Sequence, residues 1–112
     1  IHGHTYRVNV EVEGEVDPNT GFVIDFDELK AVLRDIVKKW DHKLIVPKGD
    51  MNRINLAGPF KTDIIFIDAP YPTVEYIGME LAREIYERLG RKFKVTVKIY
   101  EGLDSYAVVD YP

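Results

Sequence analysis

Polar and apolar residues alternate at the start of the chain. The even positions from residue 2 to residue 12 read His, His, Tyr, Val, Val and Val, whereas the odd positions carry Gly, Thr, Arg, Asn and Glu. This alternation predicts a β-strand with one buried face. The following tract VDPNTG is rich in turn-forming residues, so we expect a turn over residues 16–21.

Two later stretches repeat their apolar residues at helical spacing. The first begins after Asp25, which stands three residues before Glu28 in the spacing of a capping box. Its predicted apolar face consists of Phe26, Leu29, Val32, Leu33, Ile36, Val37 and Trp40. The second is expected to have Thr73 as its N-cap and to end at Gly90. Its apolar residues are Val74, Ile77, Leu81, Ile85 and Leu89.

The C-terminal part of the chain returns to a two-residue period. Apolar residues occupy the odd positions from 93 to 99, and Glu101 falls on the same parity at the far end of this predicted strand. A last strand over residues 106–111 follows GLDS, a predicted hairpin turn. Residues 43–71 hold short apolar pieces broken by Gly and Pro, for which we expect a loop with one or two short strands. The order β, α, long connection, α, β, β predicts an α+β fold with an antiparallel sheet.

Composition restricts the class of protein. A chain of 112 residues with 46% hydrophobic and 30% charged residues is typical of one globular domain. It contains no cysteine, which excludes disulfides and thiolate metal ligands within these residues. The net charge of -4 argues against a nucleic-acid partner. We find no membrane-spanning stretch and no signal peptide, so we expect a cytoplasmic protein without a membrane partner. The absence of Gln beside many charged residues suits a thermophilic source.

The first candidate site is the pair His2 and His4. Residues i and i+2 of a strand point to the same face, so both imidazoles would project together. Two imidazoles can supply two of the three protein ligands of a catalytic zinc ion. The alternative is that they are ordinary histidines near a chain end, each hydrogen-bonded or solvated.

Three further candidates carry titratable or polar groups. Glu101 would place a carboxylate at the end of an apolar face, where it either reaches solvent or receives donors from a bound guanidine-like heterocycle. Asp41 could orient the imidazole of His42, although taken alone the two are more simply explained as a polar pair that ends the first helix. Helix capping and an acid in the first turn are sufficient to explain Thr73 and Glu75.

Taken together, these segments resemble the 6-pyruvoyl-tetrahydropterin synthase family, which includes the 6-carboxytetrahydropterin synthases. The matching motifs occur in the family's order and cover nearly the whole chain: HGHTY, GFVIDFDELK, DH, PTVE and YEG. The resemblance implies the tunnelling fold, a four-stranded antiparallel sheet with two helices packed on one face. It also implies that subunits join their sheets into a barrel, as a homohexamer built from two trimers. The resemblance also implies that the first strand of the family fold is missing from this chain.

The resemblance also implies roles for individual residues. His2 and His4 match two of three zinc-binding histidines, Asp41 and His42 match a pair that assists proton transfer, and Glu101 matches the glutamate that anchors the pterin ring. Thr73 and Glu75 match residues that line the pterin pocket. The third zinc ligand and the proton-abstracting residue are expected before Ile1.

The implied reaction removes triphosphate from 7,8-dihydroneopterin triphosphate and rearranges the side chain, giving a 6-pyruvoyl or a 6-carboxy pterin. A relative that makes 6-hydroxymethyl-dihydropterin is one alternative. A non-catalytic module that binds a pterin or purine is another, and neither is excluded by the residues above.

Overall fold

The strands and helices follow one another in the predicted order. The computed structural model describes residues 5–50 and 64–112, so His2 and His4 lie outside the described residues. The elements are β1 (Tyr6–Glu13), α1 (Phe26–Trp40), β2 (Leu44–Pro47), the short 3-10 helix η1 (Lys48–Asp50), β3 (Ile64–Ile67), α2 (Val74–Arg88), β4 (Lys94–Glu101) and β5 (Ser105–Tyr111). The predicted α+β class with two helices and an antiparallel sheet is confirmed.

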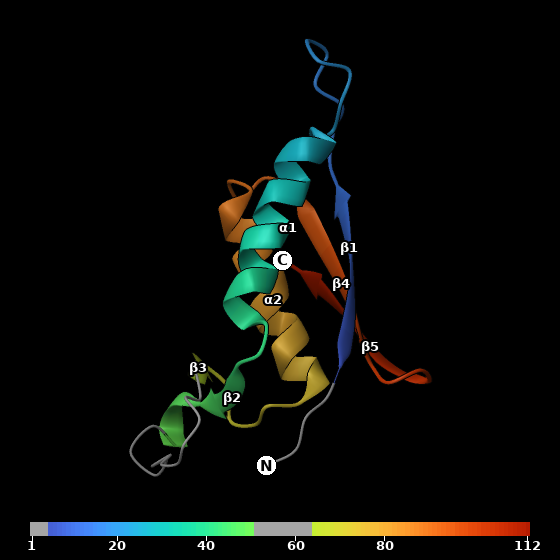
Figure 1. Cartoon of the computed structure of the whole chain (residues 1–112). Helices are drawn as coiled ribbons and strands as arrows, with labels where there is room; N and C mark the ends of the chain where they lie inside the picture. The colour runs from blue at the N-terminus through green and yellow to red at the C-terminus, as the bar shows by residue number, and fades with distance from the viewer. Residues whose placement is uncertain (1–4, 51–63) are drawn as a thin grey trace.

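The main sheet contains β1, β4 and β5 within the described residues, all antiparallel, with β4 in the centre. Tyr6 of β1 pairs with Glu101 of β4, and Glu101 pairs on its other side with Ser105 of β5. The hairpin between β4 and β5 begins at Gly102, whose φ of 73° is readily adopted by glycine. Both long helices lie on one face of this sheet (Figure 1).

The predicted N-cap of α1 and the predicted glycine after α2 are confirmed, although Asp25 bonds to Asp27 and not to the Glu28 of the predicted capping box. The Asp25 side chain caps α1 by accepting a hydrogen bond of 2.8 Å from the backbone N–H of Asp27. Gly90 follows the end of α2 with φ of 85°, the left-handed conformation that ends many helices. The C-terminal end of α1 and the N-terminal end of α2 lie toward the same end of the molecule (Figure 1).

The core lies between α2 and the central strand. The residues buried there are Ile36, Ile77, Leu81, Ala82, Ile85, Leu89, Val95, Val97 and Ile99. The helix approaches the sheet closely at Gly78, where a Cβ atom would lie only 3.0 Å from a Val109 methyl carbon and 3.2 Å from one of Ile99. A side chain at position 78 would therefore push α2 away from the strands.

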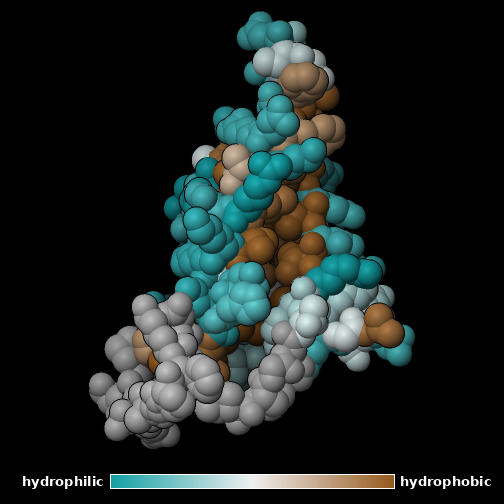
Figure 2. All heavy atoms as spheres, in the orientation of Figure 1, coloured by the Kyte–Doolittle hydropathy of each residue, from teal (hydrophilic) through white to brown (hydrophobic). Residues whose placement is uncertain are grey.

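Two members of the predicted apolar face of α1 are not buried. Phe26 is 75% exposed and Val37 is 58% exposed, so the predicted apolar face of α1 is only partly buried among the described residues. Phe26 is the first residue of the helix, and Val37 lies on a flank of α1 that the described strands do not cover. Figure 2 shows apolar side chains gathered in the band between α1 and β1, with hydrophilic side chains on both sides.

The long connection forms a separate small sheet. β2 and β3 pair in parallel, with Leu44 opposite Ile64 and Pro47 opposite Ile67. The expectation of one or two short strands in residues 43–71 is confirmed, and residues 51–63 lie outside the described part. None of the helices in the described residues has the length and apolar character needed to cross a membrane.

Candidate functional site

The described candidate residues lie toward one end of the molecule. The start of β1, the end of β4, the end of α1 and the beginning of α2 all point to the lower end of Figure 1. The antiparallel register explains part of this arrangement, because the first residue of β1 must lie opposite the last residue of β4. Asp41, His42, Thr73, Glu75 and Glu101 are thus contributed by segments far apart in sequence.

Asp41 and His42 form a close pair directly after α1. The backbone N–H of Asp41 donates a 2.8 Å hydrogen bond to the carbonyl oxygen of Val37, so Asp41 is the C-cap of the helix. His42 then adopts φ of 55°, a left-handed conformation that is uncommon for residues other than glycine. Its Nε2 atom lies 3.7 Å from Oδ2 of Asp41, and its side chain is 94% exposed. The carboxylate can therefore orient an imidazole that is open to a ligand.

Glu101 and Tyr6 face one another at the end of the sheet. They are cross-strand partners in the register and are both half-buried, on the face that the helices cover. Burial raises the pKa of the Tyr6 phenol, and the negative charge of Glu101 raises it further. The carboxylate of Glu101 therefore interacts electrostatically with the phenol of Tyr6.

Thr73 and Glu75 occupy the start of α2. The Thr73 hydroxyl oxygen accepts a hydrogen bond of 3.4 Å from the backbone N–H of Tyr76. Glu75 is exposed in the first turn of the helix, where a carboxylate interacts favourably with the helix dipole. Helix capping thus accounts for Thr73, and the helix dipole accounts for Glu75. A role of either residue in binding a pterin stays a prediction.

These residues do not converge on one point within a single chain. The end of α1 is held beside Glu84 of α2, which is eleven residues beyond Thr73. At a rise of about 1.5 Å per residue, the two positions are about 16 Å apart along the helix axis. A site that uses both Asp41–His42 and the start of α2 would therefore have to be extended or be shared between chains.

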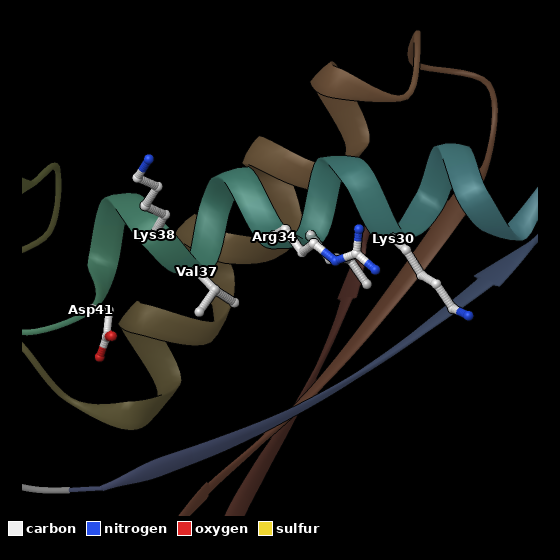
Figure 3. A pocket seen from close by; sticks show the side chains of 6 residues that line it. Lys30, Arg34, Val37, Lys38 and Asp41 are labelled. Atoms are coloured by element: carbon white, nitrogen blue, oxygen red, sulfur yellow. The ribbon is translucent and has the colours of Figure 1, made fainter.

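An open hollow of about 460 Å³ runs along the flank of α1. Its lining consists of Lys30, Leu33, Arg34, Val37, Lys38 and Asp41 (Figure 3). The four-residue spacing of Lys30, Arg34 and Lys38 is visible in the sequence, but periodicity alone does not show that the neighbouring flank is uncovered.

A cluster of cations and tyrosines on the opposite face of the sheet is a feature that the sequence pattern did not reveal. The guanidinium carbon of Arg7 lies 3.9 Å from the centre of the Tyr100 ring, and the Lys98 ammonium lies 4.3 Å from that of Tyr106. A hydrogen bond from Lys98 is the main cause that lowers the pKa of Tyr100, and Arg7 contributes a second. The cluster depends on the strand register, because Tyr100 pairs with both Arg7 and Tyr106.

The structure does not test the predicted metal site. Residues 5–50 and 64–112 contain no group of three or more His, Cys, Asp or Glu side chains placed to hold a metal ion. His2 and His4, the two predicted ligands, are outside these ranges.

Comparison with known proteins agrees with the family resemblance of the sequence motifs. The family model described as 6-pyruvoyl tetrahydropterin synthase matches residues 1–112. A putative 6-carboxy-5,6,7,8-tetrahydropterin synthase of Pyrococcus horikoshii is 39% identical over 123 residues, covering 99% of this chain and 74% of the relative. A putative enzyme of the same name from Pyrococcus abyssi is 33% identical, covering 97% of this chain and 73% of its own.

A solved structure gives the same result for the fold. The crystal structure of 6-pyruvoyl tetrahydropterin synthase from Plasmodium vivax has a TM-score of 0.79 and 25% sequence identity with this chain. The match covers 98% of this chain and 80% of the Plasmodium chain.

Proposed function

The chain belongs to the 6-pyruvoyl tetrahydropterin synthase family, and from this premise we propose that it converts 7,8-dihydroneopterin triphosphate to a pterin product with loss of triphosphate. The observation that carries the proposal is the pairing of an exposed imidazole with a carboxylate, at the end of the molecule where Glu101 also lies. The curated relatives are named for the 6-carboxy product, which favours that product over the 6-pyruvoyl one.

Glu101 is proposed to anchor the pterin ring. A carboxylate can accept two parallel N–H donors, which is the pattern that the amino group and ring nitrogen of a pterin present. The half-buried position of Glu101 supports this role, because a charge-assisted hydrogen bond is stronger where water is partly excluded. Thr73 and Glu75 are proposed to line the same pocket from the start of α2.

Asp41 and His42 are proposed to assist proton transfer. The imidazole is 94% exposed, so a substrate can reach it, and its Nε2 atom faces the Asp41 carboxylate at 3.7 Å. That carboxylate would stabilise the imidazolium that forms when the ring takes up a proton from the substrate side chain. The distance of the pair from the start of α2 supports a site completed by a second chain.

Zinc is proposed as the cofactor, with His2 and His4 among its ligands. Imidazole nitrogen is a preferred zinc donor, and both residues share the even parity of Tyr6, which faces inward in β1. When bound there, the metal would polarise side-chain hydroxyls of the substrate and make the adjacent C–H groups more acidic. Metal analysis of the purified protein tests this directly, with His2→Ala and His4→Ala expected to reduce zinc content as well as turnover.

The proposed assembly is a homohexamer, and the proposed sheet has a fourth strand beside β1. Among the described strands, β1 pairs only with β4, and the apolar band between α1 and β1 is open to solvent (Figure 2). A strand beside β1 would pair with its outer edge, and closure of the sheets into an oligomeric barrel would remove the edge that remains. Hydrogen exchange tests this, because a second neighbour would protect every backbone amide of β1 instead of alternate ones. Light scattering tests the hexamer.

The decisive experiment is incubation with 7,8-dihydroneopterin triphosphate, with released triphosphate and pterin products measured separately. The wild type should release triphosphate, while Asp41→Asn and His42→Ala should lower kcat by about 100-fold, within the range that general acid–base catalysis supplies. Asp27→Asn, at the other end of α1, is the matched control and should retain full activity. Unchanged turnover by His42→Ala would contradict its assigned role. A 6-hydroxymethyl product, or tight pterin binding without turnover, would support the alternative functions instead.

A further inference from the structure

Glu84 of α2 contacts the last two residues of α1 with one carboxylate. Its Oε1 atom accepts a hydrogen bond of 2.9 Å from the ammonium group of Lys39, and its Oε2 atom accepts one of 3.4 Å from the indole nitrogen of Trp40. The Glu84 side chain is only 16% exposed. The Glu84 carboxylate therefore connects α2 to the C-terminal end of α1.

The end of a helix is the part that most readily frays. The last turn of α1 contains Lys39 and Trp40, and the proposed proton-transfer pair Asp41–His42 follows immediately. Trp40 packs against the core, and its indole N–H finds its acceptor in Glu84. Ion pairing with Lys39 then holds the same turn from a second side.

We propose that Glu84 is a positioning residue, which fixes the last turn of α1 and thereby the direction in which the Asp41–His42 pair points. This inference rests on the proposed function only for its catalytic consequence. Glu84 acts through Lys39 and Trp40 and has no assigned contact with the substrate. Small displacements of a catalytic group lower the rate of the chemical step more than they lower substrate affinity.

A second ion pair between the same helices supplies a matched control. Arg88 of α2 donates a 2.9 Å hydrogen bond to Asp35 of α1, about one turn beyond Glu84 toward the C-terminal end of α2. This pair joins the two helices as the Glu84–Lys39 pair does, but it does not contact the last turn of α1. Asp35→Ala therefore removes an interhelical ion pair without removing the contacts of Trp40.

The test combines steady-state kinetics with Trp40 fluorescence. Glu84→Ala should lower kcat about 10-fold and leave KM within about twofold, because a misplaced catalytic group weakens the transition state and not substrate binding. Glu84→Gln keeps an acceptor for the indole and should recover at least part of kcat. Asp35→Ala should retain the kcat of the wild type.

Trp40 is the only tryptophan in the chain, so its emission reports on this turn alone. Glu84→Ala should shift that emission to longer wavelength and increase quenching by acrylamide, whereas Asp35→Ala should not.

The outcomes separate this inference from the proposed function. Unchanged Trp40 emission and quenching in Glu84→Ala would overturn the positioning role, whatever the enzyme does. An equal fall of kcat in Asp35→Ala and Glu84→Ala would also overturn it, because the effect would then be one of general helix packing. If the wild type does not turn over the pterin triphosphate, the proposed function fails, while the fluorescence still decides whether Glu84 holds the end of α1.

Discussion

Tyr6 and Glu101 lie opposite one another across β1 and β4, and the negative charge of Glu101 adds to burial in raising the pKa of the Tyr6 phenol. The pair joins the first residue of one strand to the last residue of another, beside the hairpin that leads into β5. It places a half-buried carboxylate at the end of the sheet, next to an aromatic ring. This is the arrangement on which the proposed pterin-binding role of Glu101 depends.

Replacement of Glu101 tests that role. Glu101→Gln keeps the size of the side chain but replaces one acceptor oxygen by an NH₂ group and removes the charge. Loss of two charge-assisted hydrogen bonds, each contributing about 1.5–3 kcal/mol, should lower kcat/KM by at least about 100-fold. Glu11→Gln on the outer face of β1 is the control and should behave as the wild type. Equal kcat/KM values for the two variants would remove Glu101 from the binding site.

The pH dependence of stability tests the environment of Tyr6. Its pKa is raised in the folded protein, whereas in the unfolded chain a tyrosine ionises near pH 10. Above about pH 10 the unfolded state therefore binds fewer protons than the folded state, and the free energy of unfolding should decrease as pH rises. Below that pH the contribution of Tyr6 to stability is fully present. Urea unfolding at several alkaline pH values should show a shallower decline for Tyr6→Phe than for the wild type. Tyr71→Phe, at a ring that is 63% exposed, is the control and should leave the decline unchanged.

The outer-face cluster makes a separate prediction about tyrosine titration. The pKa of Tyr100 is lowered, chiefly by a hydrogen bond from Lys98. In a pH titration followed by phenolate absorbance, one of the seven tyrosines should therefore ionise at lower pH than a typical tyrosine. Tyr100→Phe should abolish this early phase. Lys98→Met should move it to higher pH. Lys92→Met, whose ammonium lies 5.7 Å from the Phe93 ring, should not change it, and an early phase that survives in Lys98→Met would contradict the assignment.

The N-cap of α2 allows the structural role of Thr73 to be separated from a binding role. Thr73→Ala removes the acceptor for the Tyr76 N–H and should lower the free energy of unfolding by about 1 kcal/mol, as loss of an N-cap does. Thr73→Ser keeps the hydroxyl and should be nearly as stable as the wild type. If Thr73→Ser also keeps its stability but shows a higher KM for the pterin triphosphate, the methyl group contributes to the pocket. Equal stability of the Ala and Ser variants would show that the cap is not a significant interaction.

Local features of the fold could be predicted because short-range side-chain patterns determine them. The two-residue alternation around Val10 and Val97 and the caps at Asp25 and Thr73 need only neighbouring residues, and the structure confirms them. The exposure of Phe26 and Val37 could not be predicted in this way. A helical period shows which side chains share a face, but it does not show whether another element covers that face.

Some features of the candidate site could likewise be predicted from the sequence, and others depend on tertiary contacts. The sequence by itself determined the order of elements and the motifs that place the chain in its family, including the adjacent pair Asp41–His42. Only the tertiary structure decided that Tyr6 faces Glu101, that Arg7 and Lys98 surround Tyr100, and that Glu84 holds the end of α1. The physical reason is distance along the chain: Glu84 and Trp40 are 44 residues apart, and a contact of that kind depends on how whole elements pack and in which register strands pair.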